Sequence, residues 1–214
     1  MIEPVVPAKD AATLVLVRVG SDADLQVLLL QRTMRASFVA GAYVFPGGAV
    51  DQSDAELAVG YPGIPHAAFA VAAVRESFEE AGILLAHRGN GGPISADQRM
   101  LWRSELSRAD RTFNALVRDE ELVLELGQLR YLSRWVTPVG SPKRFDARFF
   151  LVSAPVDQEP IPDQTEIVGS KWVNPKTALA EHAAGEILLI LPTAMTLRSL
   201  GDSPELAAAG RGSG

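Results

Sequence analysis

The feature that most constrains this chain is an apolar segment, residues 67–83, in which three carboxylates fall within one helical turn. Its charges are confined to Arg75, Glu76, Glu79 and Glu80. Side chains three and four positions apart on a helix are neighbours, so the glutamates repel one another by about 0.2–0.5 kcal/mol per exposed pair. A solvated face tolerates that repulsion, but it would carry charge along its whole length. Hard oxygen ligands gathered in this way suit Mg²⁺ or Mn²⁺, because the cation cancels their repulsion.

A glycine-rich turn precedes this segment. The sequence predicts a short strand at residues 43–45 that runs into Pro46, Gly47 and Gly48. Glycine has no Cβ, so it lets the backbone approach a ligand or a metal closely.

The two segments together resemble the Nudix hydrolases, whose signature runs from a Gly through a first Glu to Arg-Glu, Glu-Glu and Gly. Residues 75–83 match every fixed position of its second half, with Ser77 where an apolar residue is usual. The first half departs from the signature. The second half begins 27 residues after Gly48 in place of the usual 14, Asp54 stands six residues after that glycine, and Ala67 stands eight before the second half. The first Glu is therefore shortened or missing, which affects fine positioning more than activity.

A narrower likeness covers more of the chain. Segments 28–32, 134–138 and 144–150 extend the resemblance, over roughly residues 11–200, to the Nudix branch that contains a peroxisomal coenzyme A diphosphatase. It implies hydrolysis of coenzyme A or acyl-CoA to 3′,5′-ADP and (acyl-)phosphopantetheine. A sister branch carries Arg where this chain has Ser37, a departure that favours ADP-ribose or NADH as the alternative substrate. A non-catalytic nucleotide-sensing Nudix module is the alternative of another class, and it would normally have lost the Glu-Glu pair.

The resemblance also implies the chemistry of the site. Mg²⁺ or Mn²⁺ would be held by Glu76, Glu79 and Glu80 beside the backbone of Gly48, where it could bridge diphosphate oxygens and lower the pKa of a water. Arg75 lies four residues before Glu79, so it can orient that carboxylate by an ion pair. A later loop supplies the candidate general base, for which a solvated carboxylate is the alternative interpretation. The expected catalytic residues are Arg75, Glu76, Glu79, Glu80 and Glu166.

Substrate binding calls for cations and stacking surfaces. Arg binds phosphates bidentately, although surface ion pairing explains an isolated Arg equally well. An aromatic ring can stack on a base, although strand aromatics more often belong to the core. The expected substrate-binding residues are Arg32, Phe45, Gly47, Gly48, Arg144 and Arg148. The apolar residues of the helices after residue 94 are expected to serve packing or a homodimer face.

Composition excludes several other classes. The chain has 214 residues, 47% of them apolar, which is ample for one soluble domain. No run reaches the roughly 18 apolar residues of a membrane span, and no basic region marks a secretory signal. The lack of Cys excludes disulfides and thiol nucleophiles and suits a cytoplasmic setting. A net charge of −6 argues against a nucleic-acid surface. We expect a small nucleoside diphosphate derivative as partner, with no nucleic acid and no membrane.

Hydrophobic periodicity is consistent with a single α/β domain over residues 1–204, followed by a flexible tail at 205–214. The resemblance implies the Nudix α/β/α sandwich, with a mixed sheet and a helical insertion at about 94–127. The predicted strands cover 11–19, 25–31, 43–45, 129–137, 147–153, 167–173 and 186–191. The predicted helices cover 66–82, 95–109, 112–127, 175–184 and 192–200, and a loop is expected at 51–65.

Overall fold

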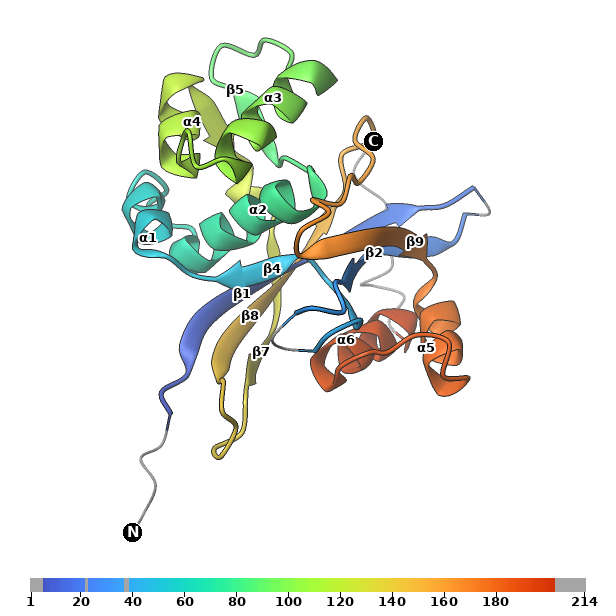
Figure 1. The fold of residues 1–214 in the computed structure, drawn as a ribbon. Helices are drawn as coiled ribbons and strands as arrows, with labels where there is room; N and C mark the ends of the chain where they lie inside the picture. The colour runs from blue at the N-terminus through green and yellow to red at the C-terminus, as the bar shows by residue number, and fades with distance from the viewer. Residues whose placement is uncertain (1–5, 22, 37–38, 203–214) are drawn as a thin grey trace.

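A seven-stranded mixed sheet forms the centre of the protein (Figure 1). The computed structural model describes residues 6–21, 23–36 and 39–202. The strands run in the order β3-β2-β1-β8-β7, with β4 paired to β1 and β9 paired to β2. β1 and β8 are parallel, and the other pairs are antiparallel. The strands are β1 (Lys9–Val19), β2 (Leu25–Arg32), β3 (Tyr43–Val44), β4 (Gly47–Ala49), β7 (Arg130–Val136), β8 (Phe145–Ser153) and β9 (Ile167–Val173).

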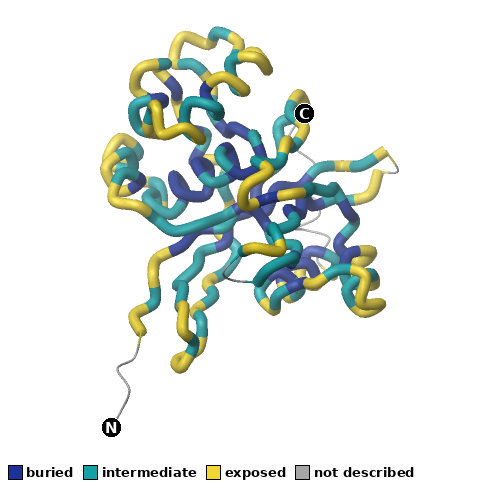
Figure 2. The backbone as a smooth tube through the Cα atoms, viewed as in Figure 1, coloured by how far each residue is buried: buried dark blue, intermediate teal, exposed yellow. Residues whose placement is uncertain are grey.

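Helices cover both faces of this sheet. Successive side chains of a strand point to opposite faces, so Leu14 and Leu16 of β1 join the core on the α2 side, whereas Val15 and Val17 join the core on the α5 and α6 side. Figure 2 shows the buried residues concentrated in the central strands and in α2. The predicted α/β/α sandwich is confirmed. The covering helices are α2 (Ala67–Ala81), α5 (Pro175–Ala183) and α6 (Leu191–Asp202).

The predicted loop at residues 51–65 contains a helix, α1 (Gln52–Ala58). A capping box closes its first turn, in which the backbone N–H of Asp51 donates to Asp54 Oδ2 at 2.8 Å. A helix of this length is marginal by itself, and its hydrophobic pattern is weak. The loop prediction was wrong because α1 depends on a tertiary contact, the ion pair between Asp54 and Arg75 of α2.

The predicted helix at residues 112–127 was correct only in its first half. α4 (Phe113–Asp119) is followed by β6 (Leu122–Leu124), which pairs antiparallel with β5 (Ala86–Arg88), and then by a short 3₁₀ turn. The side chains of β6 alternate between buried and exposed, and such a short apolar run is compatible with either a strand or a helix. The remaining helix of the insertion, α3 (Ala96–Ser107), agrees with the prediction.

The C-terminal elements also differ in one place. The predicted strand at 186–191 is wrong, since only Leu189 forms an isolated bridge, with Tyr43, and α6 begins directly afterwards. The other predicted strands and α5 are confirmed, and the side chain of Asn174 caps α5 by accepting from the N–H of Lys176. The tail predicted at 205–214 lies outside the described residues. Within the described part of the chain, no helix is long and apolar enough to cross a membrane.

Candidate active site

The acidic turn of α2 faces Gly47 and Gly48, which the sequence placed in a turn and the structure places in the short strand β4, paired with β1. The backbone N–H of Gly47 donates to Glu80 Oε2 at 3.0 Å. A Cβ placed on Gly48 would lie 2.3 Å from Glu76 Oε1, so a larger side chain would displace that carboxylate. α2 itself ends at Gly82, whose φ of 71° lies in the left-handed region that glycine accommodates. The structure thus brings both predicted glycines against the predicted glutamates.

Arg75 organises the surrounding carboxylates. Its guanidinium donates to both carboxylate oxygens of Asp54, each at 2.9 Å, and to the carbonyl of Ala49 at 2.9 Å. It also pairs with Glu76 at 2.9 Å and with Glu79 at 3.3 Å. Asp54 is fully buried, so this bidentate pair replaces its hydration. Asp54, the residue that departs from the Nudix signature, therefore still supplies a carboxylate, and this carboxylate contacts Arg75 from α1.

Burial and mutual repulsion shift the protonation of the glutamates. Burial raises the pKa of Glu80 to about 8, although the N–H of Gly47 partly offsets the shift. Burial likewise raises the pKa of Glu76 to about 7 against the opposing charge of Arg75, with the charge of Glu79 adding to the rise. Burial also raises the pKa of Glu79. Closely spaced anionic oxygens therefore hold protons near neutral pH in the absence of a cation.

The three glutamate carboxylates suit a hard divalent cation by their chemistry, although in this structure they point to other partners. Among the described residues, no three acidic or imidazole side chains converge tightly enough to enclose an ion. Glu76 and Glu79 point to Arg75, and Glu80 accepts from Gly47. A cation would relieve their repulsion and replace their protons. Cation binding would require Glu76 and Glu79 to rotate away from the guanidinium.

These pKa shifts predict a pH-dependent effect of Mg²⁺ on thermal stability. A carboxyl group whose pKa is raised by folding contributes stability below its unfolded pKa, and that stability is lost as pH rises through the folded pKa of about 7 for Glu76 and about 8 for Glu80. The Tm of the metal-free protein should fall between pH 6 and pH 8.5. Saturating Mg²⁺ should raise the Tm by several degrees more at pH 8.5 than at pH 6. Differential scanning fluorimetry with and without EDTA measures both, and an equal Mg²⁺ effect at the two pH values would contradict the prediction.

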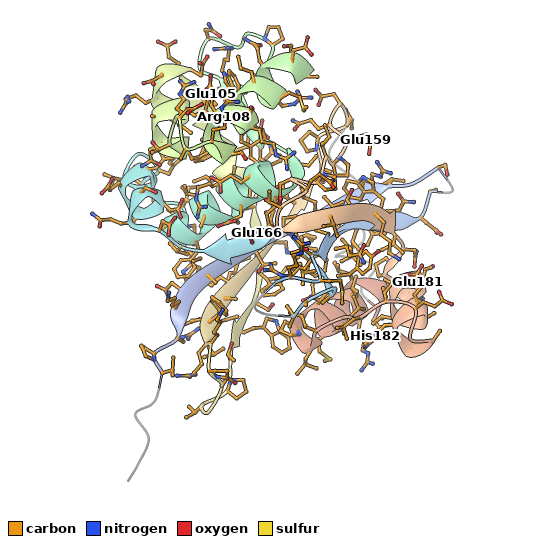
Figure 3. The ribbon with its side chains drawn as sticks, in the orientation of Figure 1. Glu105, Arg108, Glu159, Glu166, Glu181 and His182 are labelled. Atoms are coloured by element: carbon orange, nitrogen blue, oxygen red, sulfur yellow. The ribbon has the colours of Figure 1, made fainter. Side chains whose placement is uncertain are left out.

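A cleft of about 500 Å³ opens beside the acidic turn. α2 lines one side with Glu76, Glu79 and Glu80, α3 contributes a second side, and the loop before β9 contributes a third. Figure 3 shows Glu166 near the centre of the molecule, where β9 begins. The predicted general base therefore lies in the same cleft as the acidic turn. Arg32 of β2 is close by, with its Nη2 3.8 Å from Glu166 Oε2.

The helical insertion takes part in this cleft, which the sequence interpretation missed. Its apolar residues were assigned to packing or a dimer face, yet Met100 and Leu106 of α3 line the cleft. Arg103 was missed altogether, and its guanidinium donates to the backbone carbonyls of Glu79 and Glu80. No local pattern marks Arg103, because its partners are backbone atoms more than twenty residues away.

None of the six predicted substrate-binding residues lines the cleft itself. Arg32, Gly47 and Gly48 contact residues that do line it, whereas the other three lie elsewhere. Arg144 donates to the carbonyls of Thr137 at 3.0 Å and Val6 at 2.6 Å, beside the start of β8. Arg148 stacks 3.6 Å from the ring centre of Phe69. Stacking by Phe45 is wrong: its side chain is 3% exposed and belongs to the core on the α5 and α6 side, opposite α2.

Phe45 packs edge to face against Phe149, with 6.4 Å between ring centres. It points away from α2 because side chains alternate along the chain as it enters β4. Ser37, which bears on the choice of substrate, lies outside the described residues. His182 lies on α5, on the other side of the sheet from the acidic turn (Figure 3).

Known proteins share both the sequence and the fold. Residues 58–200 match the family described as the NUDT19 Nudix domain. The human acyl-coenzyme A diphosphatase NUDT19 is 28% identical over 232 residues, a match that covers 85% of this chain and 62% of the human protein. The Xenopus laevis acyl-coenzyme A diphosphatase NUDT19 is 26% identical, and the match covers 81% of this chain and 59% of that protein. This chain therefore spans less than two thirds of the length of these curated relatives.

A solved structure matches nearly the whole chain. The crystal structure of a NUDIX hydrolase from Alicyclobacillus acidocaldarius is 32% identical with a TM-score of 0.83, and the match covers 97% of this chain and 98% of the other. Together with the glycines of β4, the acidic turn and the Arg75 pairs, these matches place the chain in the Nudix hydrolase family, in the branch described by the NUDT19 Nudix domain.

Proposed function

We propose that this protein hydrolyses the diphosphate of coenzyme A or acyl-CoA in the presence of Mg²⁺ or Mn²⁺, releasing 3′,5′-ADP and (acyl-)phosphopantetheine. The observation that carries the proposal is the acidic turn, Glu76, Glu79 and Glu80, which lines a cleft of about 500 Å³. The human and Xenopus laevis relatives are named acyl-coenzyme A diphosphatases, which supports the proposal.

The lining of the cleft combines carboxylates with apolar side chains, which suits a substrate that carries both a diphosphate and an apolar chain. Glu76, Glu79, Glu80 and Glu166 supply carboxylates, and Arg32 lies 3.8 Å from Glu166. Met100, Leu106, Ile161 and Pro162 add apolar surface to the same cleft. A phosphopantetheine or acyl chain would bury apolar area against these residues, at roughly 25 cal/mol per Å². The ribose of ADP-ribose offers less apolar surface than such a chain.

Each side chain has a part in this chemistry. A divalent cation held by Glu76, Glu79 and Glu80 would supply charge to bind the diphosphate and would lower the pKa of the attacking water. Gly47 keeps Glu80 in place through its N–H. Arg75 holds Glu76 and Glu79 and is itself fixed by Asp54. Arg32 places a guanidinium beside Glu166, within reach of a bound phosphate.

Glu166 is the proposed general base. Its side chain is mostly exposed and lines the cleft beside the acidic turn, with Arg32 3.8 Å away, so a water in the cleft can reach it. We expect Glu166→Gln to lower kcat by roughly 10²-fold, which is the lower end of the contribution of a general base. KM should change little, because the amide keeps the shape of the side chain. A wild-type kcat in Glu166→Gln would assign the base to another residue.

The direct test is product identification by mass spectrometry. The protein is incubated with Mg²⁺ and separate samples of coenzyme A, an acyl-CoA, ADP-ribose and NADH. Release of 3′,5′-ADP and phosphopantetheine supports the proposal. AMP from ADP-ribose or NADH would redirect it to a nucleotide-sugar or dinucleotide diphosphatase. Turnover of none of these compounds, with binding of one of them detected by calorimetry, would favour a nucleotide-sensing module.

A further inference from the structure

The end of α2 needs partners for its backbone carbonyls, because the last turn of a helix has no N–H groups above it. Two carbonyls are bound at the C-terminal cap. The carbonyl of Phe78 accepts from the N–H of Gly82 at 2.9 Å, and the carbonyl of Ser77 accepts from the N–H of Ile83 at 3.3 Å. The carbonyl of Ala81 accepts from the N–H of Ile161 at 2.8 Å. The carbonyls of Glu79 and Glu80 remain, and these two residues carry side chains of the proposed metal site.

One side chain binds both remaining carbonyls. Arg103, on α3, donates from Nε and Nη2 to the carbonyl of Glu79 at 3.0 and 2.9 Å, and from Nη2 to the carbonyl of Glu80 at 2.8 Å. Its Nη1 donates to the carbonyl of Ile161. A cation at the C-terminal end of a helix is also favoured by the helix dipole. A single guanidinium therefore joins α3, the acidic turn and the loop before β9.

That loop leads within a few residues to the proposed general base. Asp163 accepts from the backbone N–H of Thr165 at 2.5 Å and of Glu166 at 2.7 Å, which holds the segment after Ile161 in a tight turn. The loop is thus fastened to α2 at Ile161 and folded back on itself before Glu166. Arg103 thus connects the side of the cleft that carries Glu79 and Glu80 with the side that carries Glu166.

We propose that Arg103 is a positioning residue that sets the separation between the Glu79–Glu80 turn and Glu166. It acts through backbone carbonyls, so it touches neither the cation nor the substrate in this role. The planar fork of Arg suits this task, because it presents several N–H donors in one rigid group. The effect on turnover rests on the proposed function, whereas the effect on the cation site does not.

Arg99 provides a matched control one turn earlier on α3. Its side chain is 12% exposed, and it donates to the carbonyl of Ile94 at 3.0 Å and pairs with Asp157 at 3.5 Å. These partners lie away from the acidic turn. Arg99→Ala should therefore lower the Tm without changing the cation affinity or kcat.

The test measures Mn²⁺ affinity by electron paramagnetic resonance, kcat and KM on the best substrate, and Tm, for wild type, Arg103→Ala, Arg103→Lys and Arg99→Ala. We expect Arg103→Ala to weaken Mn²⁺ binding and to lower kcat, each by about 10–100-fold, as for other residues that orient ligands. KM should change less than kcat. Arg103→Lys should recover part of both, since an ammonium cannot reach all three carbonyls.

Wild-type Mn²⁺ affinity and kcat in folded Arg103→Ala would overturn the proposal, as would an equal loss in Arg99→Ala. If Arg103→Ala does not fold, Arg103→Lys decides: reduced values support the proposal, and wild-type values overturn it. If the wild-type protein turns over no diphosphate, the proposed function fails, and Mn²⁺ affinity alone decides the role of Arg103.

Discussion

Replacement of Glu80 by glutamine is expected to lower kcat by about 10³-fold, because loss of a ligand removes several kcal/mol of cation-dependent stabilisation. The change is small in shape, and the amide oxygen can still accept from the N–H of Gly47. Burial raises the pKa of Glu80 to about 8, so its charged form is disfavoured in the metal-free fold. The variant should therefore keep its Tm at pH 8 without Mg²⁺, or raise it. The same replacement at Glu79 should also abolish turnover.

Steady-state kinetics and scanning fluorimetry test this prediction together. Glu56→Gln is the matched control, since Glu56 is an exposed helical glutamate of α1. That variant should have a wild-type kcat and a wild-type response to Mg²⁺. A wild-type kcat in Glu80→Gln or Glu79→Gln would contradict the assignment of these carboxylates as metal ligands. A loss of Tm in the metal-free variant would instead indicate a structural role.

Replacement of Asp54 by alanine should destabilise the protein by about 3–5 kcal/mol, the usual effect of removing one partner of a buried ion pair. Asp54 is fully buried and binds Arg75 through two hydrogen bonds of 2.9 Å. Its loss leaves the guanidinium of Arg75 without its main counter-charge and opens the capping box of α1. At about 2–4 °C per kcal/mol for a chain of this size, the Tm should fall by roughly 10 °C.

Urea denaturation measures the change in the free energy of unfolding. Asp110→Ala is the control, because the pair between Asp110 and Arg108 is more than half exposed and is worth only about 0–1 kcal/mol. The double variant Asp54→Ala with Arg75→Met should be destabilised by less than the sum of the two single variants, since it leaves neither partner of the Asp54–Arg75 pair buried without the other. Strict additivity would mean that the two side chains do not interact as the structure indicates.

The acidic turn, the approach of the two glycines to it and most of the regular elements were predictable because their signals are local. Residues 75–83 carry the spacing of neighbouring carboxylates on a helix. The first two strands are short apolar runs rich in Val and Leu, and Asn174 before a proline marks the start of α5. These features depend on neighbours within a few positions, which the order of residues specifies directly.

Other features depended on which distant atoms the folded chain brings together. In the sequence, Asp54 is a departure from the signature. In the structure, α1 places its carboxylate 2.9 Å from Arg75. The sequence suggested Phe45 as a stacking residue, but in the structure its side chain packs on the face of the sheet opposite α2. The helix predicted at 112–127 gives way to β6 because β5 lies beside it.

The sequence by itself determined that this chain has a Nudix helix with three carboxylates and a pair of glycines before it, because both depend on residue type and short spacing. Only the tertiary structure decided how Arg103 joins α3, α2 and the loop before β9, since backbone carbonyls leave no trace in the order of side chains. Which side chains share a cleft depends on strand register and helix packing, and both are decided by the burial of the whole core.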